Sequence, residues 1–149
     1  MLITEKIGNV NFFNINNRKV DYLVLEWHET NKMVLHKQTN TGLDLVIELN
    51  SENQSLAEGD IIYEDDFKII VIELNECDAI VLRPKSMLEM GRICNEIGEK
   101  QQQVFYQSDE ILIAFEASLF RSFSAAGYDF SRKKRKLVTP LLKPKPNFS

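Results

Sequence analysis

Histidine and cysteine, the side chains that most often bind borderline metals or take part in acid–base and nucleophilic catalysis, are few in this sequence and widely separated. The chain has two histidines and two cysteines: His28, His36, Cys77 and Cys94. Acidic neighbours at Glu26 and Glu29 make His28 a possible surface ligand, but histidines outside a ligand motif seldom bind metal, so an exposed turn residue is favoured. His36 follows two apolar residues in an expected strand, where it is either exposed or packed. Eight positions separate the two histidines, and a hairpin-like arrangement could bring them together.

Cys94 belongs to the apolar face of an expected helix. The members of that face, at helical spacing, are Met87, Met90, Ile93, Cys94 and Ile97. As a thiolate, Cys94 would suit nickel or zinc. Buried cysteine more often behaves as a small hydrophobe, and that interpretation is favoured here.

Motifs for common enzyme chemistries are missing from the sequence. It contains no Gly-x-Ser-x-Gly elbow, no Gly-x-x-x-x-Gly-Lys phosphate loop and no Gly-x-Gly-x-x-Gly fingerprint. The two cysteines do not form a Cys-x-x-Cys pair. We therefore expect a protein that is not an enzyme.

Length and composition indicate a globular protein of one ordinary domain or two small ones. The chain has 149 residues, 44% of them apolar. No apolar run approaches the ~20 residues of a membrane span, and the start lacks the pattern of a signal peptide. Two cysteines make no disulfide framework, so we expect a cytoplasmic location.

Charge is distributed unevenly along the chain. Residues 129–149 carry seven Lys or Arg and one Asp, whereas residues 1–128 carry 11 basic and 21 acidic side chains. The basic run consists of Arg132, Lys133, Lys134, Arg135 and Lys136. Such a run could bind an acidic partner or nucleic acid, but a solvated loop that leads into a last strand is favoured.

The first half of the chain predicts a small all-β domain. Short runs rich in β-branched and apolar residues predict strands at residues 21–27, 32–37, 43–49, 60–63 and 68–72. The turn signal Asn40-Thr41-Gly42 pairs the second and third of these as a hairpin. No helical pattern of useful length occurs before residue 75.

The second half predicts the order β-α-β-β-α-β. Strands are expected at residues 78–83, 104–106, 110–115 and 136–139. Ser86 and Glu89 predict a capping box at the start of the first helix, and Gly98 predicts its end. Ser118 is the expected cap of the second helix, which Gly127 would close. The fold class is therefore α+β, with an all-β domain at residues 1–75 and a ferredoxin-like domain at residues 76–149.

Five segments, in this order and spacing, resemble one protein family over nearly the whole chain. They are residues 1–9, 25–27, 56–62, the helix end at residues 94–98 with Ile97 and Gly98, and residues 144–148. Together they resemble the urease accessory protein E family, the nickel metallochaperones of urease maturation. The resemblance implies an all-β first domain, sometimes called peptide-binding, and a ferredoxin-like metal-binding second domain.

The resemblance also implies a metal site that this sequence has altered. In the family a histidine three residues after the helix-end glycine binds nickel, bridged between the two chains of a homodimer. The third residue after Gly98 is Gln101, whose amide oxygen suits hard cations better than nickel. The histidine-rich tail of many members has no counterpart up to Ser149. Glu99, Gln102 or Cys94 could still assist a weak site.

Three functions follow as hypotheses. The first is a urease accessory protein that assists nickel delivery and metallocentre assembly with a weakened metal site, working with other accessory proteins, including a GTPase, and with urease. The second is a metal-independent protein-binding scaffold of the same fold, in which the all-β domain and the basic run at residues 132–136 bind partners. The third, RNA binding, is disfavoured because Phe105 and Tyr106 are adjacent and would point to opposite faces of a strand.

Overall fold

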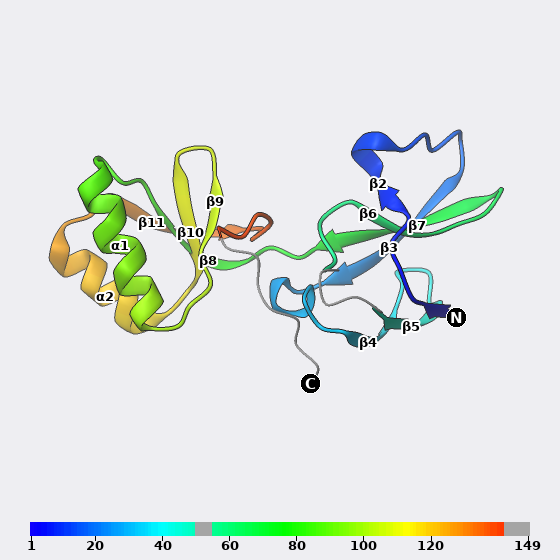
Figure 1. Cartoon of the computed structure of the whole chain (residues 1–149), viewed down its shortest axis with the longest axis horizontal. Coiled ribbons are helices and arrows are strands. Elements are labelled where there is room, and N and C mark those ends of the chain that lie inside the picture. The colour runs from blue at the N-terminus through cyan, green and yellow to red at the C-terminus, as the bar shows by residue number, and fades with distance from the viewer. Residues whose placement is uncertain (50–54, 142–149) are drawn as a thin grey trace. The chain divides into compact units, whose positions relative to one another are not determined.

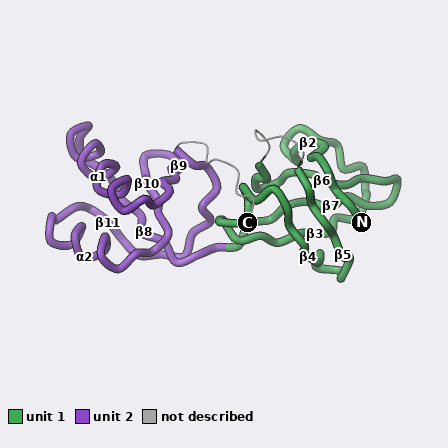
Figure 2. The backbone as a smooth tube through the Cα atoms, turned by 60° about the horizontal axis from the view of Figure 1, so that its bottom comes forward, with its two compact units in different colours: residues 1–75, 145–149 green, residues 76–144 purple. Residues whose placement is uncertain are grey.

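The computed structural model describes residues 1–49 and 55–141. These residues fall into two compact units, the first ending at Asn75 and the second beginning at Glu76 (Figure 2). Each unit has its own hydrophobic core and is described by itself. The segment at residues 144–148 that contributes to the family resemblance lies outside the described residues.

The first unit is built from two small sheets, and the only helices among its described residues are two short 3₁₀ turns, η1 (Val10–Phe12) and η2 (Trp27–Glu29). One sheet has the order β1-β5-β4, from β1 (Leu2–Ile3), β5 (Asp44–Glu48) and β4 (Val34–Gln38). The other has the order β2-β6-β7-β3, from β2 (Gly8–Asn9), β6 (Asp60–Glu64), β7 (Lys68–Leu74) and β3 (Lys19–Leu25). The expected all-β character of this half is confirmed.

The predicted hairpin is present, and it is fixed to a neighbouring strand. β4 and β5 pair antiparallel around the expected turn, where Gly42 adopts a φ of 92°. Buried Asp21 of β3 accepts hydrogen bonds from the Thr41 amide at 3.2 Å and the Thr41 hydroxyl at 2.6 Å. The core of the unit includes Leu23 and Leu25 of β3. Alternation along the strands, with inward apolar residues, builds this core.

The strand expected over residues 21–27 ends earlier, at Leu25. Trp27 instead begins η2, whose start is fixed by a capping box between Glu26 and Glu29. The Glu29 carboxylate accepts the Glu26 amide at 2.9 Å. These local side-chain bonds compete with strand pairing and turn the chain away from the sheet.

The second unit has the predicted ferredoxin-like fold. Its elements in sequence order are β8 (Cys77–Leu82), α1 (Met87–Glu99), β9 (Phe105–Gln107), β10 (Glu110–Ala114), α2 (Ala117–Ala126) and β11 (Phe130–Arg135). The sheet order is β11-β8-β10-β9, with every neighbouring pair antiparallel. Both helices cover the same face of this sheet (Figure 1). The α+β fold class is therefore confirmed.

The core of the second unit lies between this sheet and its helices. Fully buried Phe123 and Leu119 of α2, with Ile93 and Ile97 of α1, pack on sheet residues of β8 and β10. The opposite face of the sheet is also largely buried. Its members Ala79, Val81, Phe105, Leu112 and, beyond β11, Leu137 are at most 4% exposed. Tyr106, by contrast, is 44% exposed, as the alternation of the two neighbouring aromatics predicts.

Two of the predicted helix caps differ in detail from the structure. The Ser86 hydroxyl accepts the Glu89 amide as expected, but the Glu89 carboxylate accepts the amide of Lys85 instead of Ser86. The cap of α2 is Glu116, whose carboxylate accepts the amides of both Ser118 and Leu119. A carboxylate at this position satisfies two amides and also opposes the helix dipole, so it displaces the neutral serine.

The last strand was predicted in the wrong place. β11 covers residues 130–135, including most of the basic run, and pairs with β8 along its whole length. The apolar segment expected to form that strand follows β11 and runs beside β9, where the Tyr106 amide donates to the Thr139 carbonyl at 3.0 Å. A strand at a sheet edge keeps exposed side chains, so a charged sequence can form it.

Candidate metal centre

Gln101 lies immediately after α1, in a backbone conformation that most residues avoid. The helix continues through Gly98 to Glu99, with Lys100 as its cap, so the prediction that it ends on Gly98 is wrong. The Gln101 amide donates to the Gly98 carbonyl at 2.9 Å, and the Gln102 amide to the Ile97 carbonyl at 3.3 Å. These two bonds form a Schellman motif. Its left-handed position, usually a glycine, is here occupied by Gln101 with a φ of 55°.

The Gln101 side chain is exposed, and its backbone is in a conformation that few residues with a Cβ adopt. A left-handed conformation costs a residue with a Cβ about 1–2 kcal/mol, and such strain often marks a functional position. Histidine is among the non-glycine residues enriched there, so the conformation is compatible with the ligand that the family resemblance implies.

Replacing Gln101 with glycine is expected to raise the free energy of unfolding by about 0.5–1 kcal/mol. The gain is smaller than the strain relieved, because glycine also loses more backbone entropy on folding. Urea denaturation would measure it, with Gln101→Ala as the control, since alanine keeps the Cβ and should leave stability nearly unchanged. An equal gain from alanine would show that the strain does not arise from the left-handed backbone.

The end of α1 offers a cation a negative environment but few ligands. The helix carbonyls end there, and its last turn carries no basic residue. Glu99 accepts a weak hydrogen bond of 3.4 Å from Asn95. Glu96 accepts a hydrogen bond from the Ser122 hydroxyl of α2. Hydrogen bonds from Ser118 and Leu119 lower the pKa of the Glu116 carboxyl, and the charge of Lys100, just beyond α1, adds to that lowering. The exposed residues at this end, in the described chain, are therefore acidic or neutral apart from Lys100.

Cys94 packs toward the interior rather than toward a metal site. It is half-buried against the core between α1, α2 and the sheet. Burial raises the pKa of its thiol, so the protonated form persists at neutral pH. This placement agrees with the favoured interpretation of Cys94 as a small hydrophobe.

The two histidines lie in the first unit and are not part of a ligand cluster. His28 belongs to η2, with its ring 5.6 Å from that of Trp27, and exposed His36 lies on β4. Glu29 is occupied by Lys37 at 3.2 Å, and Glu26 by Asn75 at 2.9 Å. Across residues 1–49 and 55–141, no group of three or more His, Cys, Asp or Glu side chains could hold a metal ion.

The two arginines of the basic run are used within the fold. Arg132 pairs with Asp78 at 2.6 Å and lies over the Phe115 ring, 3.7 Å from its centroid. Arg135 pairs with Glu110 at 3.1 Å and donates to Gln107. The solvated loop expected here is thus a strand whose arginines are anchored. Lys133 and Lys134, both exposed, remain as candidate partner-binding residues, and Lys136 follows the strand.

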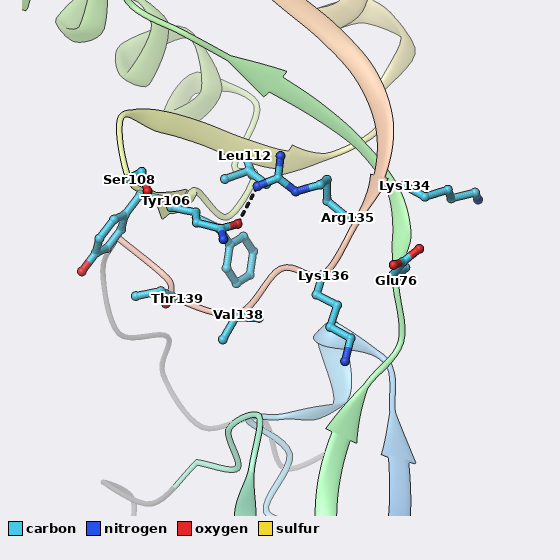
Figure 3. A pocket seen from close by; sticks show the side chains of 11 residues that line it. Glu76, Tyr106, Ser108, Leu112, Lys134, Arg135, Lys136, Val138 and Thr139 are labelled. Atoms are coloured by element: carbon cyan, nitrogen blue, oxygen red, sulfur yellow. Dashed lines mark hydrogen bonds between the residues drawn. The ribbon is translucent and has the colours of Figure 1, made fainter. Parts of the chain in front are cut away.

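A pocket of about 530 Å³ lies between β9, β11 and the segment after β11 (Figure 3). Leu112, Val138 and Phe105 give it apolar walls, and Arg135 turns toward Leu112 and Gln107 across it. Histidine and cysteine are absent from its described lining. The described lining of this pocket therefore offers no soft metal ligand and no imidazole that could act as a general base.

Sequence patterning missed one feature of α1, an exposed stripe that we call the glycine stripe: Met87, Leu88, Gly91, Asn95 and Gly98. Met87 is 90% exposed, although helical spacing assigned it to the core face. At about 100° per residue it lies roughly 120° from Ile93, which is buried. A pocket lined by Met87, Leu88, Gly91, Arg92 and Asn95 follows the stripe. The sequence signal that could have revealed this stripe was the presence of Gly91 and Gly98 inside an expected helix.

Comparison with known proteins gives one consistent result. Residues 3–75 match the family model described as the UreE urease accessory protein, N-terminal domain. A protein named urease accessory protein UreE from Flavobacterium johnsoniae is 47% identical over 128 residues, which is 86% of this chain and 78% of the relative. Proteins of the same name from Acetivibrio thermocellus and Halalkalibacterium halodurans are 31% and 29% identical, over 92% and 93% of their own lengths. In the described residues no helix is long and apolar enough to cross a membrane.

Proposed function

The chain belongs to the UreE urease accessory protein family, and on that premise we propose that it assists nickel delivery and assembly of the urease metallocentre with an altered metal site. In this role it works in the cytoplasm as a binding protein rather than an enzyme. Its partners are the other urease accessory proteins, including a GTPase, and urease itself.

The observation that carries this proposal is the position of Gln101. The residue stands exposed at the negative end of α1, with a left-handed backbone. A single described chain offers no cluster of three metal-binding side chains, so a nickel site there needs a second chain. Gln101 supplies a neutral amide oxygen where imidazole would suit nickel, and the site is weaker as a result.

The glycine stripe supports a homodimer through the second units. Gly91 and Gly98 lie inside a helix, where each costs about 0.5–1 kcal/mol relative to alanine. A Cβ added to either would meet no atom within 4 Å, so packing within the described chain does not require them. Close approach of a second α1 would require residues without a side chain at these two positions. A contact between two chains centred on Gly98 would bring their Gln101 side chains together, because the Gln101 amide is hydrogen-bonded to the Gly98 carbonyl.

The double substitution Gly91→Ala with Gly98→Ala is expected to strengthen each chain and weaken the dimer. Higher helix propensity should add about 1–2 kcal/mol to the stability of the second unit. The two added methyl groups would meet the facing helix, so we expect the dimer Kd to rise by roughly tenfold. Sedimentation equilibrium would measure that change.

A matched control is Ser124→Ala at an exposed position of α2, which raises helix propensity away from the glycine stripe. It should leave the dimer Kd unchanged. A double glycine variant that dimerises as tightly as the native chain would place the dimer contact elsewhere.

Nickel calorimetry on the native protein, with the dimer mass measured in parallel, tests the proposed metal role. We expect weak binding, with one Ni²⁺ per two chains and loss of the heat signal after a chelator is added. Binding of one Ni²⁺ per single chain would contradict a bridging site.

The second candidate function is a metal-independent scaffold of the same fold. Gln101 also favours this function, because its amide oxygen suits nickel poorly. A chain that carries no nickel can still dock on the maturation complex. Complete absence of nickel binding by a native protein that remains dimeric would select this function over the first.

A further inference from the structure

β11 is an edge strand whose outer side is unpaired in the described chain. The Arg83 amide donates to the Asp129 carbonyl at 2.9 Å, and the antiparallel register with β8 continues without a shift to Arg135. Ladder bonds in such a pair alternate along the strand. Ser131, Lys133 and Arg135 therefore bond to β8, and the backbone groups of Phe130, Arg132 and Lys134 face outward. β11 is an edge of its sheet, and no turn, loop or cap bond from a described residue reaches those backbone groups.

The side chains along this edge carry positive charge on both faces of the sheet. Lys133 and Lys134 are consecutive, so they point to opposite faces, and neither forms an ion pair with a described residue. Figure 3 shows Lys134 directed away from the pocket into which Arg135 turns. Arg132 and Arg135 are held by Asp78 and Glu110, so neither arginine is free to select a partner.

Edge lysines ordinarily prevent one sheet from adding to another. Here they exclude a second copy of the same strand, because lysine would then face lysine across the new ladder. An added strand with acidic residues would instead place unlike charges opposite these lysines. Each cross-strand pair of unlike charge stabilises the ladder.

We propose that the outer edge of β11 binds an extended acidic segment of a partner protein as an added strand. Two adjacent acidic residues of that segment face Lys133 and Lys134, one on each side of the sheet. Backbone bonds to Phe130, Arg132 and Lys134 supply the binding, and the charge pairs select the partner. This inference rests on the proposed role as an assembly protein and names the chemistry of one docking surface.

The test uses the full chain, without nickel, and a short threonine–valine peptide with two adjacent central glutamates. Amide hydrogen exchange measured by NMR should show Ser131, Lys133 and Arg135 protected before the peptide is added. With the peptide, exchange at Phe130, Arg132 and Lys134 should slow by roughly tenfold or more. The same peptide with alternate N-methylated amides, which cannot complete the ladder, should leave these three amides unprotected.

The double variant Lys133→Glu with Lys134→Glu should weaken peptide binding by about tenfold, because two favourable pairs become repulsive. Lys85→Glu with Arg92→Glu, which makes the same charge change on and beside α1, should have little effect. Unchanged exchange at the outward amides, or equal binding of the N-methylated peptide, would overturn the proposal. Because the experiment contains no nickel, either failure leaves the proposed metal role standing.

Discussion

Replacing Gln101 with histidine is expected to raise the affinity for Ni²⁺ by at least about 100-fold. Groups that only orient a metal ligand change affinity by about 10–100-fold, and a direct ligand should contribute no less. Histidine tolerates the left-handed conformation of this position, and the negative end of α1 favours a bound cation. The proposed dimer would gain two imidazoles, so calorimetry should find one Ni²⁺ per two chains.

The neighbouring substitution Gln102→His is the matched control. It adds the same imidazole one residue further on, where the backbone is outside the left-handed region and the side chain is partly buried. It should raise the affinity much less. If neither variant binds nickel, the assignment of Gln101 to the metal position is wrong. If the native protein already binds as tightly as Gln101→His, it uses other ligands.

Replacing Phe123 with alanine is expected to lower the free energy of unfolding by about 3–5 kcal/mol. The side chain is fully buried in the core of the second unit, with ring contacts to Tyr128 at 6.0 Å and Phe130 at 6.3 Å between centroids. Phe12→Ala deletes the same group from a side chain that is 92% exposed, and it should change stability by less than about 0.5 kcal/mol.

Two spectroscopic probes can place that loss in one unit. Trp27, the single tryptophan, reports on the first unit, whereas helical circular dichroism reports mainly on α1 and α2 of the second. In urea, Phe123→Ala should move the circular dichroism transition to lower concentration and the fluorescence transition much less. Equal movement of both transitions would show that the two units unfold together.

The proposed nickel site is one that a single chain does not complete. The family relationship supplies the expectation of an accessory protein, and the structure supplies an exposed position at the end of α1. In the proposed dimer, the chemistry of that position depends on Gln101 and on the side chains of the second chain beside it. Nickel affinity and dimer mass therefore need to be measured on the same preparations.

The sequence by itself determined the element order and most of the local signals. Alternating apolar residues located β5, the Gly42 turn located its hairpin with β4, and Ser86 and Gly127 located a start and an end of helices. These features depend on residues close together in the chain, so local patterning was sufficient. The same patterning predicted the ferredoxin-like order, whereas the expectation of a metal ligand at position 101 came from the resemblance to a known family and not from patterning.

Only the tertiary structure decided how the candidate sites are presented. It placed Gln101 in a left-handed Schellman position, turned Met87 out of the core, and made the basic run an edge strand instead of a loop. The identity of β11 depends on pairing with β8, about fifty residues earlier. Long-range strand pairing and the limits of a packed face are properties of the assembled fold, and a local sequence window does not contain them.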